Sequence, residues 1–143
     1  MTKFTAVVYE DIPANRLIGL KGAYGEDDLD VGKIYLKKAE KDWIPDMIST
    51  TNLKKGDTVQ VSIVNSPVWE AELSKDTRPG TLISSDDDGK VCATNIRDFK
   101  RYVGYSIEGG KAGDVIKYVR KTGTLDHAVG SDLEGMIDDG EKD

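Results

Sequence analysis

Few side chains in this sequence are of the types that enzymes use as nucleophiles or general bases. The one histidine, His127, lies near the C-terminus, where no serine or cysteine nucleophile can be placed beside it. The one cysteine, Cys92, permits neither an internal disulfide nor a multi-cysteine metal site. Its β-branched neighbourhood predicts a small buried residue on a strand. The sequence therefore contains no recognisable catalytic set, and we expect a protein that is not an enzyme.

Two acidic runs, Asp86-Asp87-Asp88-Gly89 and Glu26–Asp30, are the candidates for a calcium site. Calcium requires several oxygen ligands that converge from different positions, and neither run has the alternating spacing of an EF-hand loop. Aspartate followed by glycine tolerates a positive φ, so the first run predicts a turn. The second predicts an exposed acidic loop. We expect no metal and no cofactor.

Aromatic and basic residues offer candidate contact surfaces instead. Arg97, Lys100 and Arg101 flank Phe99, a mixture that can meet nucleic acid or another protein. The neighbouring Asp98 and the overall charge argue against nucleic acid. We interpret this stretch as a solvated connection, with a protein–protein contact as the alternative. The candidate protein-contact residues are Trp43, Arg97, Phe99, Lys100 and Arg101.

The net charge of the chain is concentrated at one end. The whole chain has 20 basic and 26 acidic side chains, a net charge of −6, yet residues 1–123 contain 19 of each. All of the net charge lies in residues 124–143. A neutral body with an acidic end has no general electrostatic affinity for nucleic acid. No run approaches the roughly 18 apolar residues of a membrane helix, and the apolar N-terminus is too short for a signal peptide. We expect synthesis in the cytoplasm and no membrane partner.

Short β-branched and aromatic segments recur between turn signals along the body of the chain, and 15 glycines lie largely between them. This spacing predicts an all-β fold, a small β-barrel or β-sandwich with short hairpins and little helix. Alternation in Asp57–Val64 and in Trp69–Leu73, on either side of Asn65-Ser66-Pro67, predicts one hairpin. Thr81–Ser84 and Lys90–Thr94 predict a second. Further strands are expected at Thr5–Tyr9, Lys33–Lys37, Tyr102–Ile107 and Asp114–Arg120.

The expected domain organisation is a single β domain at residues 1–123, whose first ten residues form either a strand or an N-terminal arm, followed by an acidic, mobile tail at 124–143. Leu125, Val129, Leu133 and Ile137 fall at i, i+4 spacing and would line one face of a helix. Two glycines, Gly130 and Gly135, interrupt that helix at about 1 kcal/mol each. Such a helix is marginal alone, and we expect a mobile tail that can order against a partner.

The arrangement of these β segments resembles that of the capsid decoration (cement, or head-stabilising) proteins of tailed bacteriophages. The resemblance covers most of residues 1–121, through short motifs that are rich in turn residues. The segments that carry it are Ile12–Leu17, Lys55–Val59, Gly80–Ile83, Asp88–Val91, Tyr102–Ser106 and Lys111–Ile116. The long region Tyr24–Thr51 and the acidic tail depart from the pattern.

The resemblance implies a virion structural protein, made in the host cytoplasm, that binds the outer surface of an expanded phage capsid. It would stabilise the shell of major capsid protein by bridging its subunits, often as a homotrimer. The possible capsid-binding arm is Thr2, Lys3, Phe4, Thr5, Ala6, Val7, Val8 and Tyr9, which could add a strand to a shell subunit. An ordinary first strand of the barrel is the equal alternative for this segment.

Two further functional hypotheses remain open at the level of sequence. A non-catalytic carbohydrate- or host-factor-binding β module would use Trp43, Trp69 or the tyrosines as its ligand platform. A small metal-dependent hydrolase or nuclease would use the clustered aspartates.

Overall fold

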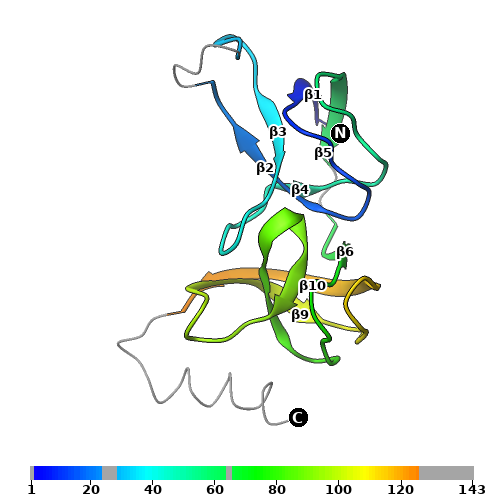
Figure 1. Cartoon of the computed structure of the whole chain (residues 1–143), viewed down its shortest axis with the longest axis vertical. Helices are drawn as coiled ribbons and strands as arrows, with labels where there is room; N and C mark the ends of the chain where they lie inside the picture. Colours follow the sequence, from blue (N-terminus) through cyan, green and yellow to red (C-terminus); the bar gives the residue numbers. More distant parts are fainter. Residues whose placement is uncertain (1, 24–28, 64–65, 126–143) are drawn as a thin grey trace.

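The computed structural model describes residues 2–23, 29–63 and 66–125, which form two five-stranded β-sheets (Figure 1). The expected all-β fold is confirmed. Sheet 1 has the strand order β4-β2-β3-β1-β5, and sheet 2 has the order β6-β10-β9-β7-β8. Sheet 1 consists of β1 (Thr2–Val8), β2 (Leu17–Lys21), β3 (Tyr35–Lys38), β4 (Met47–Ile48) and β5 (Thr58–Ile63). Sheet 2 consists of β6 (Val68–Glu72), β7 (Leu82–Ser85), β8 (Val91–Ala93), β9 (Arg101–Ser106) and β10 (Val115–Thr124).

Alternation of buried and exposed residues explains why these segments are strands with one face on a core. In β6, Trp69 and Ala71 are buried while Val68 and Glu70 are exposed. Successive side chains of a strand point to opposite faces, so this pattern assigns one face of sheet 2 to the protein interior. No helix among residues 2–23, 29–63 and 66–125 has the length and apolar character needed to cross a bilayer.

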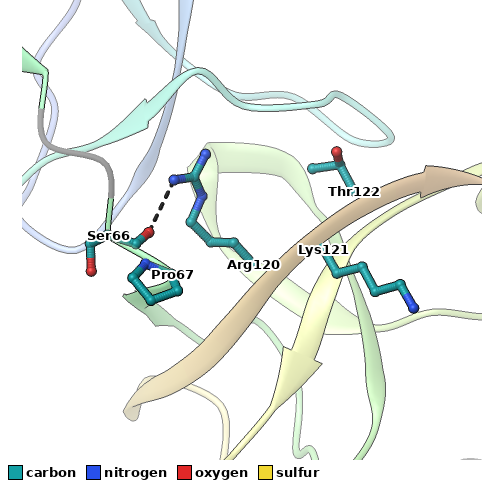
Figure 2. Close-up of a pocket in the computed structure, with 5 residues that line it drawn as sticks. All are labelled: Ser66, Pro67, Arg120, Lys121 and Thr122. Atoms are coloured by element: carbon teal, nitrogen blue, oxygen red, sulfur yellow. Dashed lines mark hydrogen bonds between the residues drawn. The ribbon is translucent and has the colours of Figure 1, made fainter.

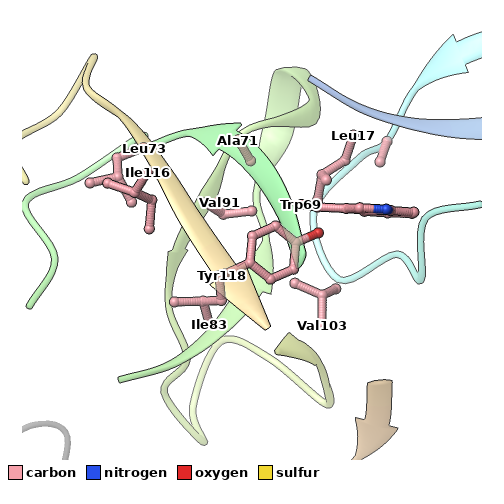
Figure 3. Packing of buried hydrophobic residues seen from close by; sticks show 10 residues of the cluster. Leu17, Trp69, Ala71, Leu73, Ile83, Val91, Val103, Ile116 and Tyr118 are labelled. Carbon is pink, nitrogen blue, oxygen red and sulfur yellow. The ribbon is translucent and has the colours of Figure 1, made fainter. Parts of the chain in front are cut away.

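The main core lies between the two sheets (Figure 3). Sheet 2 supplies most of it, and sheet 1 adds residues of β2 and of the loop after β3. Tyr118 packs edge-on against Trp69, with ring centroids 6.4 Å apart. The cluster comprises Leu17, Ala39, Trp69, Ala71, Leu73, Ile83, Val91, Val103, Ile116 and Tyr118, with Trp43 and Ile48 packed against it. Both sheets thus contribute side chains to this core, and the organisation as a single β domain stays a prediction.

Sheet 1 also curls around a smaller core of its own. This second cluster contains Ala6, Val8, Ile12, Ile18 and Leu36. Half-buried side chains of Phe4, Met47 and Val61 pack against it from β1, β4 and β5. A full barrel would pair β4 with β5, but these two strands are the edges of sheet 1. Sheet 1 is thus a half-barrel that stays open between its two edge strands.

The turn between β7 and β8 joins the two sheets. It contains the 3-10 segment η1 (Asp87–Gly89), in which Asp88 and Gly89 have φ values of 67° and 70°. The Gly89 N–H donates to the Ala39 carbonyl at 2.8 Å, and Lys38 forms an ion pair with Asp88 at 2.8 Å. The sequence-based prediction of a turn at this acidic run is confirmed, and the turn docks on β3 of the other sheet.

One predicted hairpin is wrong and the other is confirmed. β5 and β6 were expected to pair, but β5 pairs with β1 in sheet 1 and β6 pairs with β10 in sheet 2. The alternation in both strands is real, but alternation reveals the buried face of a strand and not its neighbour. β7 and β8 pair as expected, with Ile83 opposite Ala93.

The described strands reach one residue past 123, the predicted end of the β domain, and the domain boundary itself stays a prediction. β10 continues to Thr124, and Leu125 is buried at 3% exposure. The remainder of the expected tail, residues 126–143, lies outside the described residues.

Candidate functional site

A groove of about 820 Å³ lies at the open side of the half-barrel. It lies between the edge strands β4 and β5 of sheet 1 and the edge strand β6 of sheet 2. The lining residues are Phe4, Asn15, Leu20, Asp46, Met47, Ile48, Thr50, Val61, Ser62, Ser66, Val68, Trp69, Glu70 and Arg120.

The chemistry of the groove suits a polypeptide partner. Edge strands present backbone N–H and C=O groups that can pair with an added strand. The floor is apolar, since Phe4, Met47 and Val61 reach it from the second core. Leu20 is 40% exposed at the rim. The groove therefore combines strand edges with apolar contact area, as peptide-recognition surfaces do.

Arg120 organises the end of the groove next to β6. Its guanidinium lies 3.8 Å from the centroid of the Trp69 ring, and it donates a hydrogen bond of 3.1 Å to the Ser66 carbonyl (Figure 2). A smaller pocket of about 360 Å³ adjoins it, lined by Ser66, Pro67, Arg120, Lys121 and Thr122. The stacked cation fixes the start of β6 against β10 and covers the indole.

The structure brings most of the sequence-predicted contact residues together in two adjoining loops. Asp42, which precedes Trp43, accepts hydrogen bonds at Oδ1 from the backbone N–H groups of Lys100 (2.9 Å) and Arg101 (2.8 Å). The Lys41 ammonium lies 5.4 Å from the centroid of Phe99, which is only 3% exposed. Phe99 is therefore a buried anchor, while Arg97, Lys100 and Arg101 are exposed around it. Contact with a partner through these residues stays a prediction.

The predicted arm residues lie mostly in β1. The backbone of Thr2–Val7 pairs with β5, and Val7 and Val8 pair with β3. Of the two interpretations of this segment, the ordinary first strand describes the chain. Phe4 nevertheless lines the groove, while Lys3 and Thr5 are exposed. A capsid contact by these residues remains a prediction.

The two tryptophans differ in how much of the ring is open to a ligand. Trp69 is 8% exposed, with Arg120 over its face and the edge of Tyr118 against it. Trp43 is half-buried, and its ring carries the Lys37 ammonium 5.6 Å from the centroid. A sugar needs an open indole face to stack on, and Trp69 has none.

The structure describes only some of the residues that the sequence offered for catalysis or metal binding. No group of three histidine, cysteine or carboxylate side chains suitable for a metal occurs within the described ranges. Cys92 is buried on β8, and burial raises its pKa to about 12, as expected of an unreactive thiol. His127 and residues 24–28, which include most of the second acidic run, lie outside the described residues.

Sequence reasoning missed the groove because it missed two strands. β2 and β4 were not predicted, and Leu20, Met47 and Arg120 were not singled out. The two-residue strand β4 is too short to show any alternation. The one sequence signal for β2 was the apolar pair Leu17-Ile18, which lies between the first predicted strand and the acidic loop. In the structure these adjacent residues are both buried, Leu17 in the core between the sheets and Ile18 in the core of sheet 1.

Comparison with known proteins identifies relatives along the whole chain. A family model described as head fiber protein matches residues 1–142. The head fiber protein of Bacillus phage Nf is 28% identical over 139 residues, which cover 97% of this chain and 50% of that protein. The capsid fiber protein of Bacillus phage B103 is also 28% identical over 139 residues, which cover 97% of this chain and 46% of that protein. The chain thus spans about half the length of the curated relatives it matches.

A solved structure has the same fold. The crystal structure of the N base of head fiber gp8.5 in bacteriophage phi29 superposes with a TM-score of 0.74 at 23% sequence identity. The match covers 88% of this chain and 98% of that one. This chain therefore shares the fold of that base.

Proposed function

The chain belongs to the head fiber protein family, and from that premise we propose that it is a capsid-bound base, held on the outer surface of an expanded phage shell. The observation that carries the proposal is the match to the head fiber N base, since it covers nearly all of that base. The role is mechanical, and no catalytic step is part of it. The carbohydrate-binding alternative has less support, because one of its proposed platforms, Trp69, is 8% exposed and carries Arg120 over its ring.

The groove between β4, β5 and β6 is the surface we assign to the shell contact. Its exposed strand edges can accept an extended segment of a shell subunit, and its apolar floor can receive alternate side chains of that segment. Binding in this mode is specific for the assembled state when the accepted segment is ordered only in the shell.

Binding of this protein to the shell would stabilise the shell, because binding and assembly are thermodynamically coupled. A protein that binds the assembled shell and not its free subunits shifts the equilibrium toward assembly. We propose a homotrimer, because three copies that each engage one shell subunit would bridge neighbouring subunits and gain avidity. The resistance of the shell to heat should then increase with occupancy.

The test is co-sedimentation of the purified full chain with expanded shells that lack it, together with the mass of the protein by light scattering. We expect binding in a fixed ratio to shell subunits and a higher melting temperature of the occupied shells. Failure of the wild-type chain to co-sediment would reject the function itself.

A pair of matched variants tests the groove. Leu20→Asp places a charge at a groove residue that is 40% exposed, and Ile107→Asp places the same charge at a residue outside the groove that is 48% exposed. We expect the first to weaken shell binding about ten-fold or more, since a buried unpaired carboxylate costs over 1 kcal/mol. The second should bind like the wild type. Equal binding by both variants would place the shell contact elsewhere.

A further inference from the structure

Among the described residues, most of the hydrogen-bond donors of the Arg120 side chain have no acceptor. A guanidinium has five N–H donors, and Arg120 uses one of them, in the bond of 3.1 Å to the Ser66 carbonyl. The side chain makes no other hydrogen bond and no ion pair with any residue in the ranges 2–23, 29–63 and 66–125. Arg120 is half-buried, so the remaining donors lie at a partly dry surface where an acceptor would be bound strongly.

The guanidinium of Arg120 is nevertheless held in place. It stacks 3.8 Å from the centroid of the Trp69 ring, and the backbone N–H of Arg120 donates to the Pro67 carbonyl at 2.8 Å. Figure 2 shows the guanidinium directed toward Ser66 and the Lys121 side chain directed away from it. Stacking engages the face of the guanidinium and leaves the N–H groups at its edge. A ligand that binds this edge loses little free energy in ordering the side chain, because the fold already orders it.

Open space surrounds this part of the chain. Arg120 and Ser66 line both the groove of about 820 Å³ and the adjoining pocket of about 360 Å³. Arg120 therefore lies where the two concave surfaces meet. A ligand group that enters from the groove has room to reach its N–H donors.

The charges of the groove favour a single carboxylate as the ligand of Arg120. The charged residues among those that line the groove are Arg120, Asp46 and Glu70. Glu70 lies three residues along β6 from Pro67, to which Arg120 is hydrogen-bonded, and three residues of a strand span about 10 Å. Repulsion over this distance is largely screened at about 0.1 M salt. A polyanion such as nucleic acid would instead place several phosphates against both carboxylates.

We propose that Arg120 selects the shell segment that enters the groove, by binding an acidic side chain of that segment. This inference rests on the proposed function and names the chemistry of the segment: extended, apolar at alternate positions, and acidic at the position next to Arg120. The planar guanidinium matches a carboxylate through two parallel N–H···O hydrogen bonds. Arg120 is thus a specificity-determining residue, in addition to its packing over Trp69.

Co-sedimentation of full-chain variants with expanded shells is the first measurement. Arg120→Gln removes the charge, and Arg78→Gln is the matched control, since Arg78 is exposed and lines neither the groove nor the pocket. We expect Arg120→Gln to bind shells about ten-fold more weakly than the wild type, because a charge-assisted pair is lost. The control should bind like the wild type. Equal binding by Arg120→Gln and the wild type would overturn the proposal.

Peptides separate the carboxylate contact from the packing of Arg120 over Trp69. Amidated overlapping peptides that span the shell subunit are tested for binding to the full chain. Each one that binds is compared with a form in which asparagine replaces aspartate and glutamine replaces glutamate. We expect the wild type to prefer the acidic form of one internal peptide about ten-fold, and Arg120→Gln to show no preference. A purely structural role of Arg120 would weaken the binding of both forms equally and leave the preference intact.

The outcomes distinguish this inference from the proposed function. A preference that persists in Arg120→Gln, or the absence of any internal peptide whose binding depends on an acidic side chain, would overturn the role of Arg120. The C-terminal peptide of the shell subunit is tested as the amide and as the free acid, and a preference for the free acid alone would overturn it in favour of a terminal carboxylate. In each of these cases co-sedimentation of the wild type with shells would leave the proposed function standing.

Discussion

Two side chains, Tyr118 and Asp86, are expected to affect the stability of the fold in opposite ways. Tyr118 is fully buried in the core between the sheets, where its ring packs against Trp69. Its hydroxyl has no hydrogen-bond partner among the described residues, and burial raises the pKa of that hydroxyl. Asp86, by contrast, accepts hydrogen bonds from Ser74 Oγ at 2.6 Å and from the Asp87 N–H at 2.9 Å. Removing the polar group is therefore expected to leave stability unchanged or raise it at Tyr118, and to lower it at Asp86.

Tyr118→Phe should leave stability unchanged or raise it by up to about 1 kcal/mol, because it removes a buried hydroxyl that lacks a partner and keeps the ring. Tyr118→Ala should cost about 3–5 kcal/mol through the cavity it leaves. Urea unfolding followed by circular dichroism measures both. A loss above 1 kcal/mol in Tyr118→Phe would show that the hydroxyl is hydrogen-bonded.

Asp86 should make stability depend on pH in the acid range. Partial burial opposes its ionisation, but the hydrogen bonds from Ser74 and Asp87 outweigh burial and hold the pKa of Asp86 below its usual value. A group whose pKa is lowered by folding stabilises the protein above its unfolded pKa, near 3.9, and this contribution disappears as the pH falls through the folded value.

Asp86→Asn should therefore cost about 1–2 kcal/mol at pH 7 and progressively less below about pH 4. Ser74→Ala, which removes one of the two donors, should weaken the pH dependence without abolishing it. Free energies of unfolding between pH 2 and 7 measure the effect. A difference between wild type and Asp86→Asn that stays constant over this range would rule out the assigned role.

At the scale of elements, the turn between β7 and β8 of sheet 2 packs against sheet 1. The backbone of Gly89 lies so close to Leu17 that there is no room for a side chain. A Cβ at Gly89 would lie 2.6 Å from the Leu17 carbonyl oxygen. The positive φ of 70° independently favours glycine. An acidic run that suggested a calcium loop in the sequence is thus a structural contact between sheets.

Gly89→Ala should destabilise the protein by about 3 kcal/mol or more, because it adds a steric clash to the cost of a positive φ. Gly113→Ala is the control, since its φ is 94° but a Cβ there meets no atom within 4 Å. The control should lose only about 1–2 kcal/mol. Thermal and urea unfolding compare the two, and equal losses would mean that the contact with Leu17 can relax.

At the scale of the whole molecule, one core joins two differently shaped sheets. Membership in the head fiber family makes the protein a bacteriophage virion component of structural type, which confirms the resemblance to capsid-associated proteins. Both sheets contribute side chains to this shared core.

The chain should therefore unfold in one cooperative transition. Trp69 reports on the core between the sheets and the far-ultraviolet circular dichroism on all strands, so the two signals should change at the same urea concentration. A Trp43→Phe variant isolates the Trp69 fluorescence. Separate midpoints would show that the sheets unfold independently.

The sequence by itself determined the features that depend on local chemistry. Alternation and glycine-rich turns predicted the all-β fold, the β7–β8 hairpin and the turn at Asp87–Gly89. The distribution of charge along the chain separated a neutral body from an acidic end, and the single histidine and single cysteine offered no recognisable pair of nucleophile and base. These properties are set by residues within a few positions of one another.

Only the tertiary structure decided which strands are neighbours. β5 and β6 are consecutive and both alternate, yet they lie in different sheets, since pairing depends on contacts with β1 and β10 far away in the chain. The same long-range pairing leaves β4 and β5 as open edges and so creates the groove. It also brings Arg120 of β10 against the start of β6, where its guanidinium meets Ser66 and Trp69. Period-two patterns specify faces, whereas neighbours and register depend on the packing of the whole chain.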